Sequence, residues 1–140
     1  MLKKTLMSLV LSLGLTSSLV ANEELRANML ELGASMSAAQ AGFFANDKKA
    51  VLAAVLQLRK DSKTILSDKK KVIQLLPDDV KYKASIAINS AELIAKYADE
   101  IEYTLQDRNM RMINQQMRTQ KAFREIEKQC FRCHNLVRDW

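Results

Sequence analysis

Residues that interrupt helices are rare between positions 22 and 140 of this sequence. Gly33 and Gly42 are the two glycines of this region, and Pro77 is its one proline. Apolar residues recur there at steps of three and four, the spacing of an α-helix that buries one face. No segment alternates apolar and polar residues for long enough to predict a β-strand. The sequence therefore predicts an all-helical fold.

Short turns divide this region into four long helical segments. Asn46–Asp47 is a turn and N-cap signal, and Pro77–Asp78 opens the third helix. Along that helix, apolar residues from Val80 to Leu105 alternate steps of four and three, which is typical of packing against nearly antiparallel neighbours. The predicted helices cover residues 22–45, 47–66, 78–106 and 110–137. The predicted fold class is all-α, an antiparallel up-down-up-down four-helix bundle.

Two local features add to this picture. The connection after the second helix is basic, but the apolar residues of VIQLL at 72–76 predict that it packs on the domain. Alanines recur along the third helix, and such small side chains are consistent with two arrangements. One is close packing between helices, and the other is a bundle with room for a bulky group.

Residues 1–21 have the order of a secretory signal peptide, with a basic start, an apolar run and small residues before Ala21. A retained membrane anchor is the alternative, although the apolar run is short for a span. Cleavage would leave one periplasmic domain, residues 22–140, without stable membrane insertion. Removing Lys3 and Lys4 would lower the formal charge from +6 to +4. This small excess, spread among alternating charges, argues against a nucleic-acid partner.

Both cysteines and the one histidine of the chain lie in the segment CFRCH, residues 130–134. On a helix, Cys130 and Cys133 point to one side, and His134 lies one turn beyond Cys130 on that side. C-x-x-C-H is the heme-attachment motif. It predicts one covalently attached heme c, with both cysteines as thioether anchors and His134 as the proximal axial ligand of iron.

Three other interpretations of CFRCH remain open. A structural zinc site takes four ligands, so a carboxylate or a second chain would have to complete it. A thioredoxin-like C-x-x-C follows a strand of an α/β fold, and no strand is predicted here. The third interpretation is a chance cluster without a ligand. A structural disulfide would close too short a loop to constrain the unfolded chain much.

The second axial ligand cannot be a histidine, because the chain has only one. On the last helix, Met110, Met112 and Met117 are too far away, since even Met117 lies about 25 Å from His134 at about 1.5 Å per residue. On the first helix, Met29 lies at the depth of His134 in the predicted bundle, and Met36 lies about 10 Å deeper. Met29 is therefore the candidate distal ligand. Lysine, a small molecule and an open position are the alternatives, and core packing is the other role of such a methionine.

At these residues the sequence resembles the class II c-type cytochromes, the family of cytochrome c prime and its methionine-ligated low-spin relatives. The ending CFRCHNLVRDW is similar to the family pattern C-x-x-C-H-x-x-aromatic-Arg, with Val137 in place of the aromatic residue and Arg138 as the arginine. LLPDDVK, before the third helix, is similar to another family segment. MLELGASM resembles the low-spin pattern of Met, then Gly four residues on and Met three further. The resemblance covers residues 22–140 and implies the distal-ligand role for Met29.

The resemblance implies an exported monoheme protein that transfers electrons with redox partner proteins and is not an enzyme. It also implies propionate contacts for Arg138 and Arg26, although the gas-binding branch has an arginine where this chain has Leu25. A five-coordinate protein that binds or scavenges a small gas such as nitric oxide is the alternative function, and a heme-free interaction module is a third. Related bundles often form homodimers through their first two helices, and no residue set here predicts a catalytic acid, base or nucleophile.

Overall fold

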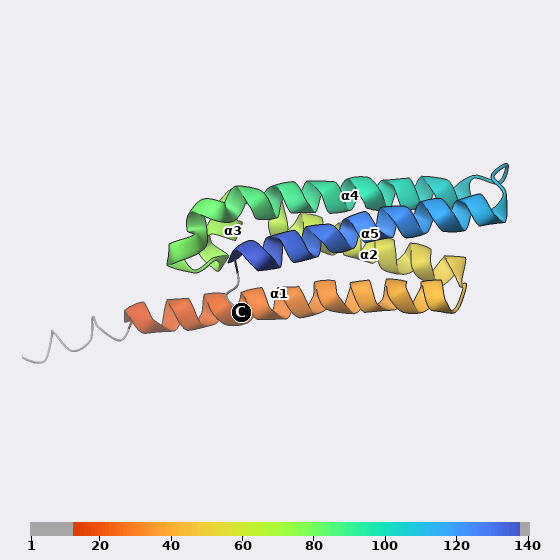
Figure 1. Ribbon diagram of the computed structural model, residues 1–140. Coiled ribbons are helices and arrows are strands. Elements are labelled where there is room, and N and C mark those ends of the chain that lie inside the picture. The colour runs from red at the N-terminus through yellow and green to blue at the C-terminus, as the bar shows by residue number, and fades with distance from the viewer. Residues whose placement is uncertain (1–12, 138–140) are drawn as a thin grey trace, which may run out of the picture.

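The computed structural model describes the backbone of residues 13–137 and the side chains of residues 23–135. This part consists of helices and short connections, with no strand, which confirms the predicted all-α class. The helices are α1 (Leu13–Phe44), α2 (Lys48–Leu66), α3 (Lys69–Leu75), the 3-10 helix η1 (Asp78–Lys83), α4 (Ala84–Gln106) and α5 (Met112–Val137). Helix α1 packs against α2, α2 against α4, and α4 against α5 (Figure 1).

The turn between α1 and α2 has the geometry predicted for Asn46–Asp47. Asn46 adopts the left-handed conformation with φ of 54°, which asparagine tolerates better than most residues. The Asp47 carboxylate caps α2 by accepting hydrogen bonds of 2.9 and 3.0 Å from backbone N–H groups of its first turn. Gly42 lets the two helices approach closely, because a Cβ there would lie 2.9 Å from both Cγ2 and N of Val51.

The hydrophobic core lies between the long helices. Leu58 of α2, Ile101 of α4 and Ile126 of α5 are fully buried. Ala91 and Ala98 of α4 are also buried, so this part of α4 packs closely against its neighbours. No helix in the described part of the chain is long and apolar enough to cross a membrane.

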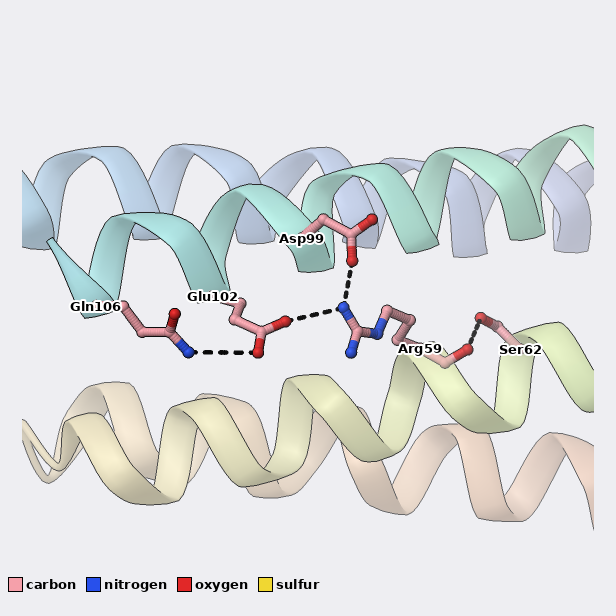
Figure 2. A network of polar contacts seen from close by, with 5 residues as sticks. All are labelled: Arg59, Ser62, Asp99, Glu102 and Gln106. Carbon is pink, nitrogen blue, oxygen red and sulfur yellow. Dashed lines mark hydrogen bonds and ion pairs between the residues drawn. The ribbon is translucent and has the colours of Figure 1, made fainter.

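A network of polar side chains connects α2 to α4 beside this core. Arg59 Nη1 donates to Glu102 Oε2 at 2.9 Å and also to Asp99 Oδ1. Gln106 Nε2 donates to the other oxygen of Glu102 at 3.3 Å, and the Ser62 hydroxyl donates to the Arg59 carbonyl at 3.0 Å. Figure 2 shows the guanidinium of α2 between the two carboxylates of α4. The hydrogen bond to Asp99 is the main reason that the pKa of Arg59 is raised.

Several boundaries differ from the sequence-based prediction. The connection after α2, for which no helix was predicted, contains the helix α3. The third predicted helix begins as the 3-10 helix η1, and its α-helical part begins at Ala84. Helix α1 begins at Leu13 rather than at residue 22, because the predicted start was placed at the cleavage site and residues 13–21 contain no proline. Residues 1–12 of the predicted signal peptide lie outside the described residues.

Candidate functional site

A cavity of about 550 Å³ lies where α1 faces α3, the start of α4 and the end of α5. This volume is within the range of about 300 to 1,000 Å³ that is typical of ligand pockets. Apolar side chains form most of the wall. The residues that line the cavity are Leu25, Arg26, Met29, Leu66, Val72, Leu75, Leu76, Pro77, Ala87, Cys133 and His134.

The last turns of α5 carry CFRCH to this cavity. Cys133 is half-buried and His134 is exposed, and both line the cavity. Cys130, one turn earlier, is also half-buried and packs against the hydrophobic core rather than lining the cavity. Arg132, between the cysteines, donates from Nη1 to Asn89 Oδ1 of α4 at 3.4 Å. The motif is therefore helical, as predicted, and sits with one side against the protein interior.

The environment of the two thiols keeps them protonated. They are free cysteines, not joined in a disulfide. Burial raises the pKa of Cys130 to about 11, with smaller contributions from the nearby Cys133 and Glu127. Burial also raises the pKa of Cys133. Redox-active cysteines of thioredoxin-like proteins have lowered pKa values instead, so this environment weighs against the thiol–disulfide interpretation.

Met29 faces CFRCH across the cavity from α1. It is half-buried, lines the cavity and packs against the core. Met36, two turns further along α1, is also half-buried against the core, but it does not line the cavity. Of the two methionines that the sequence placed on the first helix, Met29 is thus the one that shares a cavity with His134.

Contacts between α1 and α5 explain why Met29 and His134 lie at the same end of the molecule. Gln40 Nε2 donates to Glu127 Oε1 at 2.9 Å, and the rings of Phe43 and Phe123 lie 5.1 Å apart between centroids. In these two pairs, the α1 residue that comes earlier in the chain meets the α5 residue that comes later. Residues further toward the start of α1 therefore lie beside the end of α5.

Helix α3 supplies a wall of the cavity that the sequence analysis did not assign to the site. The Asp68 carboxylate caps it by accepting hydrogen bonds of 2.9 and 3.3 Å from backbone N–H groups of its first turn. Val72 and Leu75 of α3 and the following Leu76 are buried and line the cavity. The apolar residues of VIQLL, which predicted packing on the domain, were the signal that could have found this wall.

Of the two arginines predicted to contact the heme propionates, the structure describes Arg26. Arg26 is exposed and lines the cavity, one turn before Met29 on α1. Arg138 lies outside the described residues. Beside the cavity, Lys71 Nζ of α3 lies 3.4 Å from Glu24 Oε1, an ion pair that holds α3 to α1. Of the two predicted arginines, Arg26 is therefore the one that the structure places at the cavity.

The donor set of the cavity fits a heme. His134 offers an imidazole and Met29 a thioether, the pair that ligates iron in cytochromes c. Two thiols with the C-x-x-C-H spacing stand beside them, and the wall is apolar. Among the described residues, no group of three or more His, Cys, Asp or Glu side chains is arranged to hold a metal ion. Comparisons of the chain with family models, curated proteins and solved structures find no match.

Proposed function

We propose that this chain is an exported monoheme c-type cytochrome that transfers electrons. Cys130 and Cys133 would hold the heme covalently, and His134 and Met29 would be the axial ligands of its iron. The observation that carries the proposal is that Met29 and His134 line one cavity from two different helices. Met29 is remote from CFRCH in sequence, so their meeting is independent of the motif that suggested heme.

The proposed architecture is an antiparallel up-down-up-down four-helix bundle formed by α1, α2, α4 and α5. It is supported by the packing of each long helix on the next and by the short connections at residues 45–47 and 107–111. The contacts of α1 with α5 at Gln40–Glu127 and Phe43–Phe123 would close the bundle. Residues 1–21 would be the signal peptide that directs this domain to the periplasm.

When bound, heme would supply a reversible one-electron couple to this site. The protein's part is to bind it, exclude water and select the ligands. Leu66, Leu75 and Leu76 are buried side chains of the cavity wall, and an apolar wall disfavours the more highly charged oxidised state. The Met29 thioether is a soft ligand, and together with burial it favours a high reduction potential.

Several residues would act around the site. Arg26 would contact a heme propionate from the rim, and Arg138 is proposed for the same role from the chain end. Among the residues that the structure describes, none that lines the cavity is an aspartate or a glutamate. Electron exchange with partner proteins, not catalysis, is the activity that this residue set supports.

Covalent heme attachment is the first test. The chain is produced in a host that attaches heme in the periplasm, and its intact mass and absorption spectra are measured. We expect the mass of one heme on the wild-type chain and none on the Cys130→Ala/Cys133→Ala double variant. We also expect a low-spin spectrum with a methionine–iron charge-transfer band in the oxidised protein.

Two results would contradict the proposal in different ways. A wild-type chain without covalent heme after maturation would reject heme binding altogether. A covalently loaded but high-spin protein would reject Met29 as a ligand and favour the small-gas function, which needs an open axial position. The double variant is the control for attachment, because it lacks both anchors and leaves the rest of the sequence unchanged.

A further inference from the structure

The end of the molecule opposite the cavity has a surface that the proposed function does not use. It is formed by residues 44–49, at the junction of α1 and α2, and by residues 107–121, which comprise the connection after α4 and the first ten residues of α5; we call it the basic tip. Gln116 Nε2 donates to Asn46 Oδ1 at 2.8 Å, and Lys48 Nζ donates to Gln115 Oε1, which joins the two segments. Figure 1 shows both connections at the same end of the helices.

Large apolar side chains of the basic tip are exposed to solvent. Phe44 is 91% exposed, Ile113 57% and Met117 63%. Ile113 and Met117 are four residues apart on α5, so they lie on one face of that helix. Phe44 is the last residue of α1 and projects from the surface instead of lining a groove. These exposed apolar side chains share one end of the molecule, and exposed apolar groups that occur together mark an interaction site more often than scattered ones do.

Positive charge surrounds these apolar residues. The two segments contain six cationic side chains, Lys48, Lys49, Arg108, Arg111, Arg118 and Lys121, and two carboxylates, Asp47 and Asp107. Both carboxylates accept hydrogen bonds from nearby backbone N–H groups at turns. Among the described residues, the ion pairs lie elsewhere and include none of these six cations. The net positive charge of the tip therefore remains available to an anionic partner.

We propose that the basic tip docks on an anionic lipid surface. Projecting apolar side chains insert into the boundary between headgroups and acyl chains, while surrounding Lys and Arg side chains bind the anionic headgroups. An acidic protein would have to offer a concave apolar pocket to the projecting Phe44, whereas a lipid surface receives it without any preformed shape. The proposal requires peripheral docking only, which agrees with the lack of a membrane-crossing helix among the described residues.

Docking through the basic tip has a geometric consequence for the cavity. Met117 and His134 are both on α5, and at about 1.5 Å per residue they are about 25 Å apart along its axis. The lipid-bound protein would therefore hold its cavity away from the surface, open to partners in solution. This inference uses other residues than the proposed function, and either can fail without the other.

Vesicle binding tests the proposal. Protein is mixed with vesicles of phosphatidylcholine alone or of phosphatidylcholine with phosphatidylglycerol, and the bound fraction is measured by sedimentation at low and high salt. We expect binding to the anionic vesicles only, weakened by salt because the headgroup attraction is screened. All variants share one N-terminus, so any lipid affinity of residues 1–21 cancels in the comparison.

Matched variants locate the binding surface. We expect Arg111→Gln/Arg118→Gln to lower the partition coefficient by roughly 20- to 30-fold, at about a tenfold factor for each 1.4 kcal/mol. Lys69→Gln/Lys70→Gln, on exposed residues of α3, makes the same change in net charge and should lower the partition coefficient far less. To test the apolar side chains, we expect Phe44→Ser/Met117→Ser to lower the partition coefficient roughly tenfold. Tyr82→Ser, which changes an exposed side chain outside the basic tip, should leave the partition coefficient unchanged.

Three outcomes would overturn the proposal. Equal losses in the two double charge variants would mean that net charge, not the basic tip, drives binding. Unchanged binding of Phe44→Ser/Met117→Ser would exclude insertion of the apolar side chains. Failure to bind anionic vesicles, together with binding of polyglutamate that Arg111→Gln/Arg118→Gln abolishes, would identify the partner as an acidic protein instead of lipid.

Discussion

Met29 and His134 line the same cavity, one from α1 and the other from α5. They come from opposite ends of the sequence, so their shared cavity depends on how the helices pack. The pairs Gln40–Glu127 and Phe43–Phe123 set the relative position of the two helices on which this meeting depends.

Replacing Met29 tests the proposed iron ligand. In heme-loaded protein, we expect Met29→Ala to remove the methionine–iron charge-transfer band and to lower the reduction potential, because a soft ligand of Fe(II) is lost. Met36→Ala is the matched control, since Met36 is half-buried on the same helix but does not line the cavity. Spectra and redox titration of both variants provide the comparison. An unchanged band in Met29→Ala would exclude this ligand.

Replacing Gly42 tests the close contact of α1 with α2. A Cβ at this position would lie 2.9 Å from Val51 N, a backbone atom that cannot move without shifting the helix. We expect Gly42→Ala to lower the free energy of unfolding by about 1 to 3 kcal/mol, in spite of the better helix propensity of alanine. Urea unfolding followed by circular dichroism measures the change.

Gly33→Ala is the control for this substitution, because a Cβ at Gly33 has no atom within 4 Å. Alanine is favoured over glycine in the interior of a helix, so the variant should be more stable by up to about 1 kcal/mol. Equal changes in the free energy of unfolding for Gly42→Ala and Gly33→Ala would contradict the close contact between Gly42 and Val51.

Replacing Arg59 tests the network between α2 and α4. The arginine is 28% exposed and Glu102 29%, while Asp99 is 58% exposed, so solvent screens much of the attraction. We expect Arg59→Met to lower the free energy of unfolding by about 0.5 to 1 kcal/mol at low salt and by less at high salt. Lys60→Met, at the exposed neighbouring residue, should have little effect at either salt concentration. A loss that does not depend on salt would point to packing of the arginine stem instead.

The raised pKa of Cys130 makes the heme-free chain less stable at high pH. Its folded-state value is about 11 against an ordinary value of 9.0. The folded state therefore holds the proton more tightly, and the resulting stability is complete below about pH 9 and is lost as the pH rises toward 11. The loss should amount to about 2 to 3 kcal/mol.

Unfolding by urea at pH 8 and pH 11 measures this loss. The informative quantity is the difference between the wild-type chain and Cys130→Ala, because contributions that the two proteins share cancel. The variant should lose less stability over the interval, by about the amount assigned to Cys130. Identical pH dependence in the two proteins would mean that the thiol is not buried in the heme-free chain.

Much of the helical fold was predictable because its signals are local. The N-cap at Asp47 was read from the sequence and is confirmed by its two hydrogen bonds. Helix α3 was missed, since it has only seven residues and begins with three lysines. A helix this short is stable only through tertiary packing, here of Val72 and Leu75, and a sequence does not show such packing directly.

The residues proposed for the candidate site were named from the sequence, but the shape of the site was not. CFRCH and Met29 were identified, and Met29, Cys133 and His134 do line one cavity. The wall formed by α3 could not be placed, because it depends on how a connection folds back onto the end of α5. For the same reason the sequence did not show that, although both cysteines pack against the core, Cys133 lines the cavity and Cys130 does not.

The close contact at Gly42 fixes one end of α1 against the start of α2. Contacts at Gln40 and Phe43 fix this end of α1 to α5, and Met29 lies about 20 Å further along the helix at about 1.5 Å per residue. Beyond Met29, toward its N-terminus, α1 is also joined to α3 by the exposed ion pair of Glu24 with Lys71. A small rotation of α1 at this junction would therefore displace Met29 more than Gln40 or Phe43, which makes the position of Met29 in the cavity sensitive to the packing around Gly42.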